Sequence, residues 1–323
     1  MQSAVLVTAP IPQPALDTLR AADLDVRHYV AGPVMARDEL LAQVRGVAGI
    51  YCLINDRIDG PVLDAAGPSL RVVSTMSVGY DHVDVRACAA RGIAVGNTPG
   101  VLTETTADLA LALLLATARR IPEAVASVHN GTWGAWKAEW MTGRDLFGGT
   151  VGIVGMGRIG QAVARRLVGF GCRLIYSGPA PKPEADALGA AFVPLPQLLA
   201  ESDFVTLHCP LNAQTMHLIN GATLAQMKPT AILINTTRGG VVDQDALNAA
   251  LRAGTIAAAG LDVTTPEPLP PDHPLLTLPN CVVLPHIGSA TIATRTRMAQ
   301  MAAQNLIAGV RREPLPFAVI MRA

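Results

Sequence analysis

The chain has 323 residues, of which 50% are hydrophobic and 15% are charged, and its formal net charge at pH 7 is zero. This length allows two domains that each bury a core. A neutral chain without long basic runs lacks the electrostatic basis for binding nucleic acid or an anionic membrane surface. The five cysteines are scattered, with no C-x-x-C pair, and no signal peptide is recognised. We therefore expect reduced thiols and a cytoplasmic protein.

The first hundred residues alternate between strand-like and helix-like segments. Short apolar runs predict strands at residues 4–8, 26–30, 49–54, 71–76 and 93–95. Helical patterns fall between them, for example at 35–45 and 83–90. Continuous apolar runs are typical of parallel strands that are covered on both faces. This part of the chain is therefore predicted to form one α/β unit.

A long apolar helix is predicted at residues 103–120. Its most hydrophobic part, 107–118, is too short to span a bilayer. A helix that is apolar on nearly all sides is typical of a protein core or of a face shared with a second subunit.

Residues 151–160 read VGIVGMGRIG, which predicts an apolar strand, a G-x-G-x-x-G turn and the start of a helix. In this context the turn indicates a dinucleotide-binding site. Gly155 permits the tight turn, Gly157 lets the backbone approach a pyrophosphate, and Gly160 lets the helix pack closely on the strand. The helix N-terminus offers unpaired N–H groups to the anion. The alternative is an ordinary strand-to-helix turn.

A second α/β series starts at this glycine turn and continues almost to the end of the chain. Its further strands are predicted at residues 173–176, 204–207, 231–235, 258–262 and 282–284, and a last helix at 290–309. We predict an α/β protein of two doubly wound parallel-sheet domains. A Rossmann-type cofactor domain at residues 99–291 is inserted in a smaller, flavodoxin-like substrate domain made of 1–98 plus 292–323.

Three polar side chains come after three late strands of the second series. Arg238 comes after the strand at 231–235, Glu267 after the strand at 258–262, and His286 after the strand at 282–284. Ligands of open α/β sheets gather at the carboxyl ends of the strands, so we expect these side chains to converge.

Their chemistry suits the reduction of a 2-keto acid. Arg238 offers a planar donor fork to the substrate carboxylate and polarises the carbonyl. His286 can protonate the carbonyl oxygen as hydride arrives from a nicotinamide. A nearby carboxylate favours a charged histidine, and Glu267 is the natural partner. Asp262, at the end of its strand, is placed to reach the nicotinamide end of the cofactor. Each residue alone has a structural alternative, and their joint placement favours catalysis.

These residues lie within motifs that extend nearly from end to end of the chain. The chain resembles the D-isomer-specific 2-hydroxyacid dehydrogenases, and within them the glyoxylate reductase/hydroxypyruvate reductase branch. The segments that carry the resemblance are residues 77–82, 101–107, 151–160, 257–264, 266–270 and 284–291. The resemblance implies that Arg238, Glu267 and His286 are the catalytic set. It also implies a homodimer formed through the cofactor domain.

The resemblance assigns further residues to substrate and cofactor. Backbone groups of Val78 and Gly79 hold the substrate carboxylate, Ser289 adds a contact, and Arg238 and His286 complete the substrate set. The expected cofactor contacts are Gly155, Gly157, Arg158, Ile159, Ser177, Lys182, Pro210, Thr236, Arg238, Asp262, His286 and Gly288.

Three tryptophans, Trp133, Trp136 and Trp140, have the i, i+3, i+7 spacing of a helix face. This spacing predicts that two of them pack in a core. In the branch that the chain resembles, one tryptophan of this segment enters the active site of the partner subunit and limits substrate size. Trp136 matches that position.

The choice of nicotinamide cofactor depends on the residues directly after the second strand of the Rossmann-type domain. An acidic residue there normally binds the ribose hydroxyls of NAD. This chain instead reads SGPAPK at residues 177–182, and the missing carboxylate permits a 2′-phosphate. Ser177 and Lys182 could bind that phosphate, although Pro179 stands where related reductases usually have an arginine. We predict that NADPH is preferred and that NADH is also used.

Other functions stay open. The chain could be a D-2-hydroxyacid dehydrogenase for another keto acid, such as one of the phenylpyruvate type. It could also be a non-catalytic NAD(P)-sensing protein, like the corepressors that share this fold. The string Asp81-His82-Val83-Asp84 could suggest a metal. Such strings are common at helix starts, where carboxylates favour the dipole, and we expect no metal site.

Overall fold

The structure is a computed structural model that describes residues 2–320. The chain divides into two compact units. The first contains the described residues up to 102 and from 290 onward, and the second contains residues 103–289. Among the described residues, no helix combines the length and the apolar character needed to cross a membrane.

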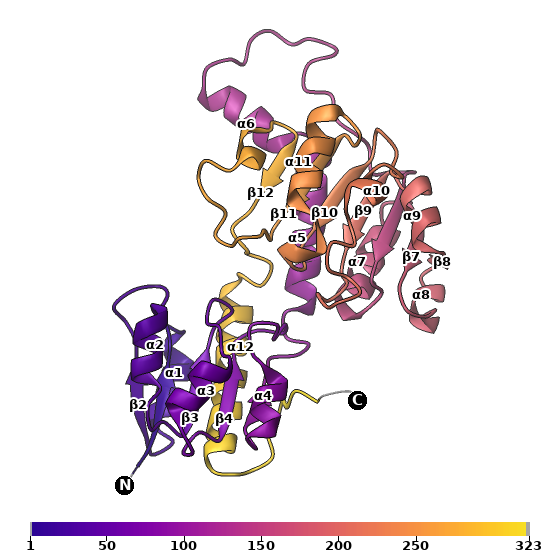
Figure 1. Cartoon of the computed structure of the whole chain (residues 1–323). Helices are drawn as coiled ribbons and strands as arrows, with labels where there is room; N and C mark the ends of the chain where they lie inside the picture. Colours follow the sequence, from indigo (N-terminus) through magenta and orange to yellow (C-terminus); the bar gives the residue numbers. More distant parts are fainter. Residues whose placement is uncertain (1, 321–323) are drawn as a thin grey trace. The chain divides into compact units, whose positions relative to one another are not determined.

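The first unit is built on a five-stranded parallel sheet in the order β2-β1-β3-β4-β5. Strands β2, β3 and β4 of this sheet are labelled in Figure 1. Its strands are β1 (Ser3–Val7), β2 (Leu24–His28), β3 (Gly49–Cys52), β4 (Val72–Thr75) and β5 (Ala94–Gly96). Its helices are α1 (Gln13–Arg20), α2 (Arg37–Gln43), α3 (Gly60–Ala66), α4 (Val85–Ala90) and α12 (Ile292–Val310). This strand order is that of flavodoxin-like sheets.

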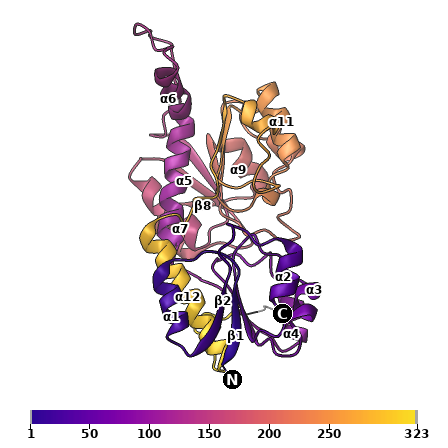
Figure 2. The ribbon, with the colours of Figure 1, turned by 90° about the vertical axis from the view of Figure 1, so that its left-hand side faces the viewer.

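Helices cover both faces of this sheet, with α1 and α12 on one face and α2, α3 and α4 on the other (Figure 2). Strands β3 and β4 are buried along their whole length, which explains why they read as continuous apolar runs. Asn305 of α12 is fully buried and satisfied, since it donates to Asn97 O at 3.0 Å and accepts from Phe317 N at 2.9 Å.

The second unit contains a seven-stranded parallel sheet in the order β12-β11-β10-β9-β6-β7-β8. Its strands are β6 (Thr150–Val154), β7 (Arg173–Ser177), β8 (Ala191–Phe192), β9 (Phe204–Leu207), β10 (Ile232–Asn235), β11 (Ala258–Leu261) and β12 (Cys281–Val283). Chain order reverses between β6 and β9, as it does at the nucleotide-binding crevice of a Rossmann sheet.

Helices also sandwich the second sheet. The helices of this unit are α5 (Thr103–Ala118), α6 (Ile121–His129), α7 (Arg158–Val168), α8 (Pro183–Asp186), α9 (Leu195–Glu201), α10 (Gly221–Leu224) and α11 (Gln244–Ala253), with 3₁₀ turns at Gly239–Val241 and Pro274–Thr277. One core contains side chains of α5 and α7, and a second core contains side chains of α9, α10 and α11. The predicted fold class, two doubly wound parallel sheets, is confirmed.

The expectation of a helix with two core tryptophans is wrong. Trp133, Trp136 and Trp140 lie in the irregular segment between α6 and β6, and they are 65%, 85% and 38% exposed. Helical spacing alone does not produce a helix, and the two glycines Gly131 and Gly134 disfavour one at this position. Figures 1 and 2 show α6 and the segment after it extending away from the sheet of the second unit.

Candidate active site

Apart from Trp136, the site residues predicted in the second unit follow or end strands of one parallel sheet, so they lie at the same edge of that sheet. Gly155, Gly157, Arg158 and Ile159 follow β6, and the remaining residues follow other strands or end one. Ser177 ends β7 and Lys182 follows it, Pro210 follows β9, Thr236 and Arg238 follow β10, Asp262 and Glu267 follow β11, and His286, Gly288 and Ser289 follow β12.

The three glycines of the β6–α7 turn meet different surroundings. Gly155 has a φ of 96°, and a Cβ there would lie 2.6 Å from the backbone nitrogen of Cys209. A Cβ at Gly160 would overlap the carbonyl oxygen of Gly155, so only glycine lets α7 approach β6 this closely. A Cβ at Gly157, in contrast, meets no atom within 4 Å. Gly157 therefore borders open space at the start of α7, as a pyrophosphate site requires.

Two buried polar atoms near this turn lack a hydrogen-bond partner among the described residues. They are His208 Nδ1, directly after β9, and Thr236 Oγ1, directly after the neighbouring β10. Burial lowers the pKa of His208 to about 3, so its ring is neutral at physiological pH. Buried polar atoms are normally paired, and unpaired ones at a strand edge fit a polar ligand. The glycine turn and these two atoms together fit a nicotinamide dinucleotide.

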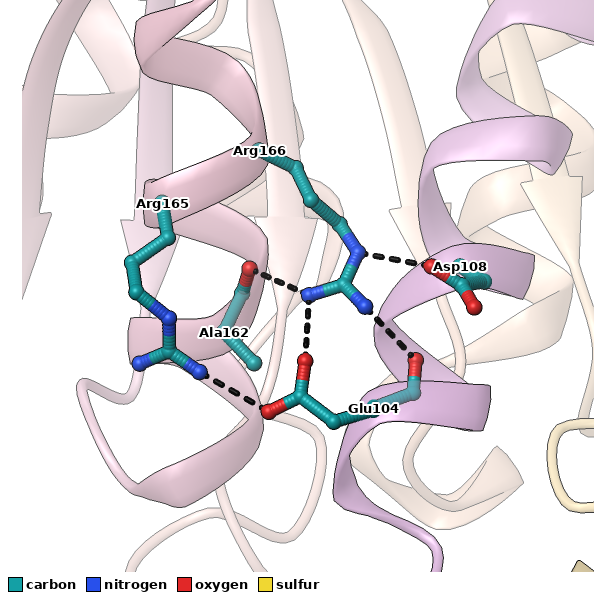
Figure 3. A network of polar contacts seen from close by, with 5 residues as sticks. All are labelled: Glu104, Asp108, Ala162, Arg165 and Arg166. Atoms are coloured by element: carbon teal, nitrogen blue, oxygen red, sulfur yellow. Dashed lines mark hydrogen bonds and ion pairs between the residues drawn. The ribbon is translucent and has the colours of Figure 1, made fainter.

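Four charged side chains fasten α7 to α5 (Figure 3). Arg166 donates to Glu104 Oε2 at 2.8 Å and to Asp108 Oδ1 at 2.7 Å, and it also donates to the backbone oxygen of Glu104 at 3.2 Å. Arg165 donates to the other carboxylate oxygen of Glu104 at 2.9 Å. Isolated surface ion pairs contribute little, but a network with backbone contacts restrains two helices more firmly. It helps to fix the helix that begins at the glycine turn.

The turn after β7 carries no carboxylate between residues 177 and 183. Its far end is tied back to the strand, because the backbone nitrogen of Lys182 donates to the hydroxyl of the fully buried Tyr176 at 2.7 Å. Lys182 itself is exposed. The Ser177 hydroxyl and the Lys182 side chain are therefore the polar groups of this turn that could bind a ligand at the end of β7.

Asn235, the last residue of β10, shapes the turn that carries Arg238. Its fully buried side chain accepts from Thr237 N at 3.0 Å and donates to Arg238 O at 3.0 Å. The next residue after Arg238, Gly239, packs directly on the turn after β11, because a Cβ there would overlap the carbonyl of Thr264. The turns that carry Arg238 and Glu267 are thus in backbone contact.

His286 and Glu267 meet directly, with 2.5 Å between His286 Nδ1 and Glu267 Oε1. Their side chains are 22% and 33% exposed, respectively. The backbone of His286 is held at a φ of 54°, which non-glycine residues rarely adopt and which is often found at functional sites. Because Glu267 occupies Nδ1, Nε2 is the ring nitrogen that could exchange a proton with a ligand.

Asp262 holds the turn that carries His286. Its two carboxylate oxygens accept from Ile287 N and Gly288 N, each at 2.8 Å, and its own carbonyl accepts from His286 N at 2.9 Å. The side chain is almost completely buried, and burial raises the pKa of Asp262. Sequence reasoning gave Asp262 a role toward the cofactor but missed this backbone clamp.

The expected substrate-carboxylate loop lies in the first unit, after β4. Asn97 donates to Val78 O at 2.8 Å, and Ser77 Oγ donates to Gly79 O at 2.6 Å. Both carbonyls are therefore held by side chains of the same unit, which fixes the orientation of these peptide groups.

Comparison with known proteins identifies the family. A family model described as the NAD binding domain of D-isomer specific 2-hydroxyacid dehydrogenases matches residues 111–288. The chain belongs to this family. The resemblance inferred from the motifs is thus confirmed, and the chain is an oxidoreductase that acts on a CH–OH group with a nicotinamide cofactor.

Relatives and solved structures extend this similarity over nearly the whole chain. A glyoxylate reductase/hydroxypyruvate reductase of Mus musculus is 54% identical over 315 residues, 97% of this chain and 96% of that protein. The crystal structure of a protein from Thermus thermophilus has a TM-score of 0.92 and 51% identity, and the match covers 98% of this chain and 100% of that one. An NADPH-dependent glyoxylate/hydroxypyruvate reductase from Sinorhizobium meliloti, solved with NADP and malonate, has a TM-score of 0.87 and 37% identity over 99% of this chain and 97% of its own.

Gly157 and Gly160 provide a matched test of cofactor binding. Gly157→Ala adds a methyl group to open space, so it should leave Tm nearly unchanged but raise the KM for NADPH roughly tenfold, the factor given by about 1.4 kcal/mol. Gly160→Ala forces an overlap with Gly155 and should lower the free energy of unfolding by about 1–3 kcal/mol. Thermal unfolding and steady-state kinetics separate the two effects. Equal losses of Tm with unchanged KM would contradict the assignment of Gly157.

Proposed function

We propose that this dehydrogenase uses NADPH to reduce small 2-keto acids, namely glyoxylate to glycolate and hydroxypyruvate to D-glycerate. The observation that carries the proposal is the direct contact of His286 with Glu267 at the edge of a sheet that also holds the glycine turn and Arg238. The choice of substrate is supported by the relatives from Mus musculus and Sinorhizobium meliloti, which are both named as reductases of glyoxylate and hydroxypyruvate.

The roles of the chain's own residues follow from their chemistry. A reduced nicotinamide, when bound, supplies a hydride to the keto carbon. The Arg238 guanidinium binds the carboxylate and draws electron density from the carbonyl. The backbone of Val78 and Gly79 and the side chain of Ser289 complete the binding of the acid. His286 gives its Nε2 proton to the carbonyl oxygen, and Glu267 stabilises the charged ring before that transfer.

A substrate panel tests this function. With NADPH, the wild-type protein should turn over glyoxylate and hydroxypyruvate with a higher kcat/KM than pyruvate or phenylpyruvate. His286→Ala removes the proton donor and should lower kcat by about 10²–10⁴-fold, while the Kd for NADPH changes little. Near-normal turnover of His286→Ala would contradict the role of His286. Inactivity of the wild type on all four acids would instead favour a cofactor-sensing protein.

We propose NADPH as the preferred cofactor because the turn after β7 lacks a carboxylate and carries Ser177 and Lys182. A carboxylate at Ser177 would repel the 2′-phosphate of NADPH. Ser177→Asp should therefore lower the ratio of kcat/KM for NADPH to that for NADH at least about tenfold. Ser177→Ala is the matched control without a charge and should lower the ratio less. A wild-type enzyme that favours NADH would overturn this part of the proposal.

We also propose a homodimer in which Trp136 contributes to the site of the partner subunit. The support is α6 and the segment after it, where the apolar residues Val125, Val128, Trp133 and Trp136 are 49%, 55%, 65% and 85% exposed in the single chain. Large exposed apolar patches commonly mark interfaces. Sedimentation should give twice the mass of one chain, and Trp136→Ala should raise activity on phenylpyruvate relative to glyoxylate. A monomer at assay concentration would contradict the proposal.

A further inference from the structure

A buried glutamine is hydrogen-bonded to the turn that carries Glu267. Gln244 is only 8% exposed and is the first residue of α11. Its Oε1 accepts from Thr265 N at 2.7 Å, and its Nε2 donates to Thr265 O. One side-chain amide thus satisfies both backbone groups of a single residue that lies two positions before Glu267.

These two hydrogen bonds are important because the rest of the turn has no regular secondary structure and is largely exposed. Residues 263–270 contain no helix or strand, and Thr265, Pro266 and Glu267 are exposed. A second bond extends the restraint, since Thr264 Oγ1 donates to Pro266 O at 2.8 Å. The peptide groups of Thr265 and Pro266 are therefore held immediately before Glu267.

The start of helix α11, where Gln244 lies, is itself held in place. Asp243 caps α11 by accepting from Ala246 N at 3.0 Å, and its own backbone nitrogen donates to Ile219 O at 2.8 Å. Leu247, one turn after Gln244 in the same helix, is buried in the core of the second unit. Because the start of α11 is fixed in this way, the side chain of Gln244 can hold Thr265 in a fixed position.

We propose that Gln244 is a positioning residue that holds Glu267 against Nδ1 of His286. The inference rests on the proposed function, in which Glu267 keeps His286 charged until it gives up its proton. The two partners are held separately: Asp262 fixes the turn of His286, and Gln244 fixes the turn of Glu267. At 22% and 33% exposure, both side chains face competition from water, so a small displacement of Glu267 weakens their contact.

The side-chain amide of Gln244 is needed because it both accepts a hydrogen bond from Thr265 N and donates one to Thr265 O. Methionine has nearly the shape of glutamine but makes neither bond. Glutamate keeps the acceptor for Thr265 N, yet it places an unpaired carboxylate oxygen against the carbonyl of Thr265. Gln244→Met and Gln244→Glu should both loosen the turn before Glu267. One introduces an apolar side chain and the other a charged one, so the test remains valid if one of the two variants folds poorly.

The test compares these two variants with Leu251→Ala, which removes a buried side chain from the last turn of the same helix. Each protein is assayed with NADPH and glyoxylate across pH, and the titration of the His286 ring is followed by NMR in the protein without cofactor, assigned with His286→Gln. Asp262, the other carboxylate that interacts with His286, is unchanged in every variant.

We expect kcat of Gln244→Met to fall roughly tenfold, a partial loss of the general-acid contribution, with a smaller change in KM for glyoxylate. The alkaline limb of the kcat profile and the midpoint of the His286 titration should both move to lower pH. Gln244→Glu should change in the same direction. Leu251→Ala should lose stability while its pH profile and its His286 titration match those of the wild type.

The proposal is overturned if the His286 titration of both Gln244 variants matches that of the wild type, or if Leu251→Ala moves it equally. A wild-type protein that reduces no keto acid would contradict the proposed function, and the titration without cofactor would still decide the role of Gln244.

Discussion

The contact between Glu267 and His286 is the interaction on which the proposed chemistry depends. A histidine donates a proton efficiently only if it is charged at the working pH, and a carboxylate 2.5 Å from Nδ1 favours that charge. Neither residue belongs to a helix or strand, so the fold must hold both turns by other means. Asp262 does so for His286 through two backbone N–H groups, and Gln244 does so for Thr265 ahead of Glu267.

The parallel sheet of the second unit explains why these turns are close together. Strands β10, β11 and β12 are neighbours and run in the same direction, so the segments after them leave the sheet at one edge. The absence of a side chain at Gly239 lets the Arg238 turn lie directly on Thr264. The same edge carries the β6–α7 glycine turn. The residues proposed to bind the cofactor and those proposed for acid–base chemistry thus lie in one region without any long connection.

The fold class and the position of Arg238, Glu267 and His286 at one sheet edge were predictable because they depend on local and periodic signals. Continuous apolar runs predicted buried parallel strands, and polar residues after three neighbouring strands predicted a shared edge. The supporting residues were not predictable, because their partners are remote in sequence. Nothing near Gln244 indicates a bond to Thr265, and Asp262 gives no sign of clamping residues 287 and 288. The helix predicted from the spacing of the three tryptophans was wrong, because periodicity predicts a helix only where the intervening residues also favour one.

The central claim is that hydride and proton add to a 2-keto acid to give the D isomer. The most direct measurement is the reduction of hydroxypyruvate with NADPH that carries deuterium at C4 of the nicotinamide on the transferred side, followed by chiral analysis of the product. The account predicts D-glycerate with deuterium at C2. L-glycerate, or D-glycerate without deuterium from either labelled face of the cofactor, would contradict it.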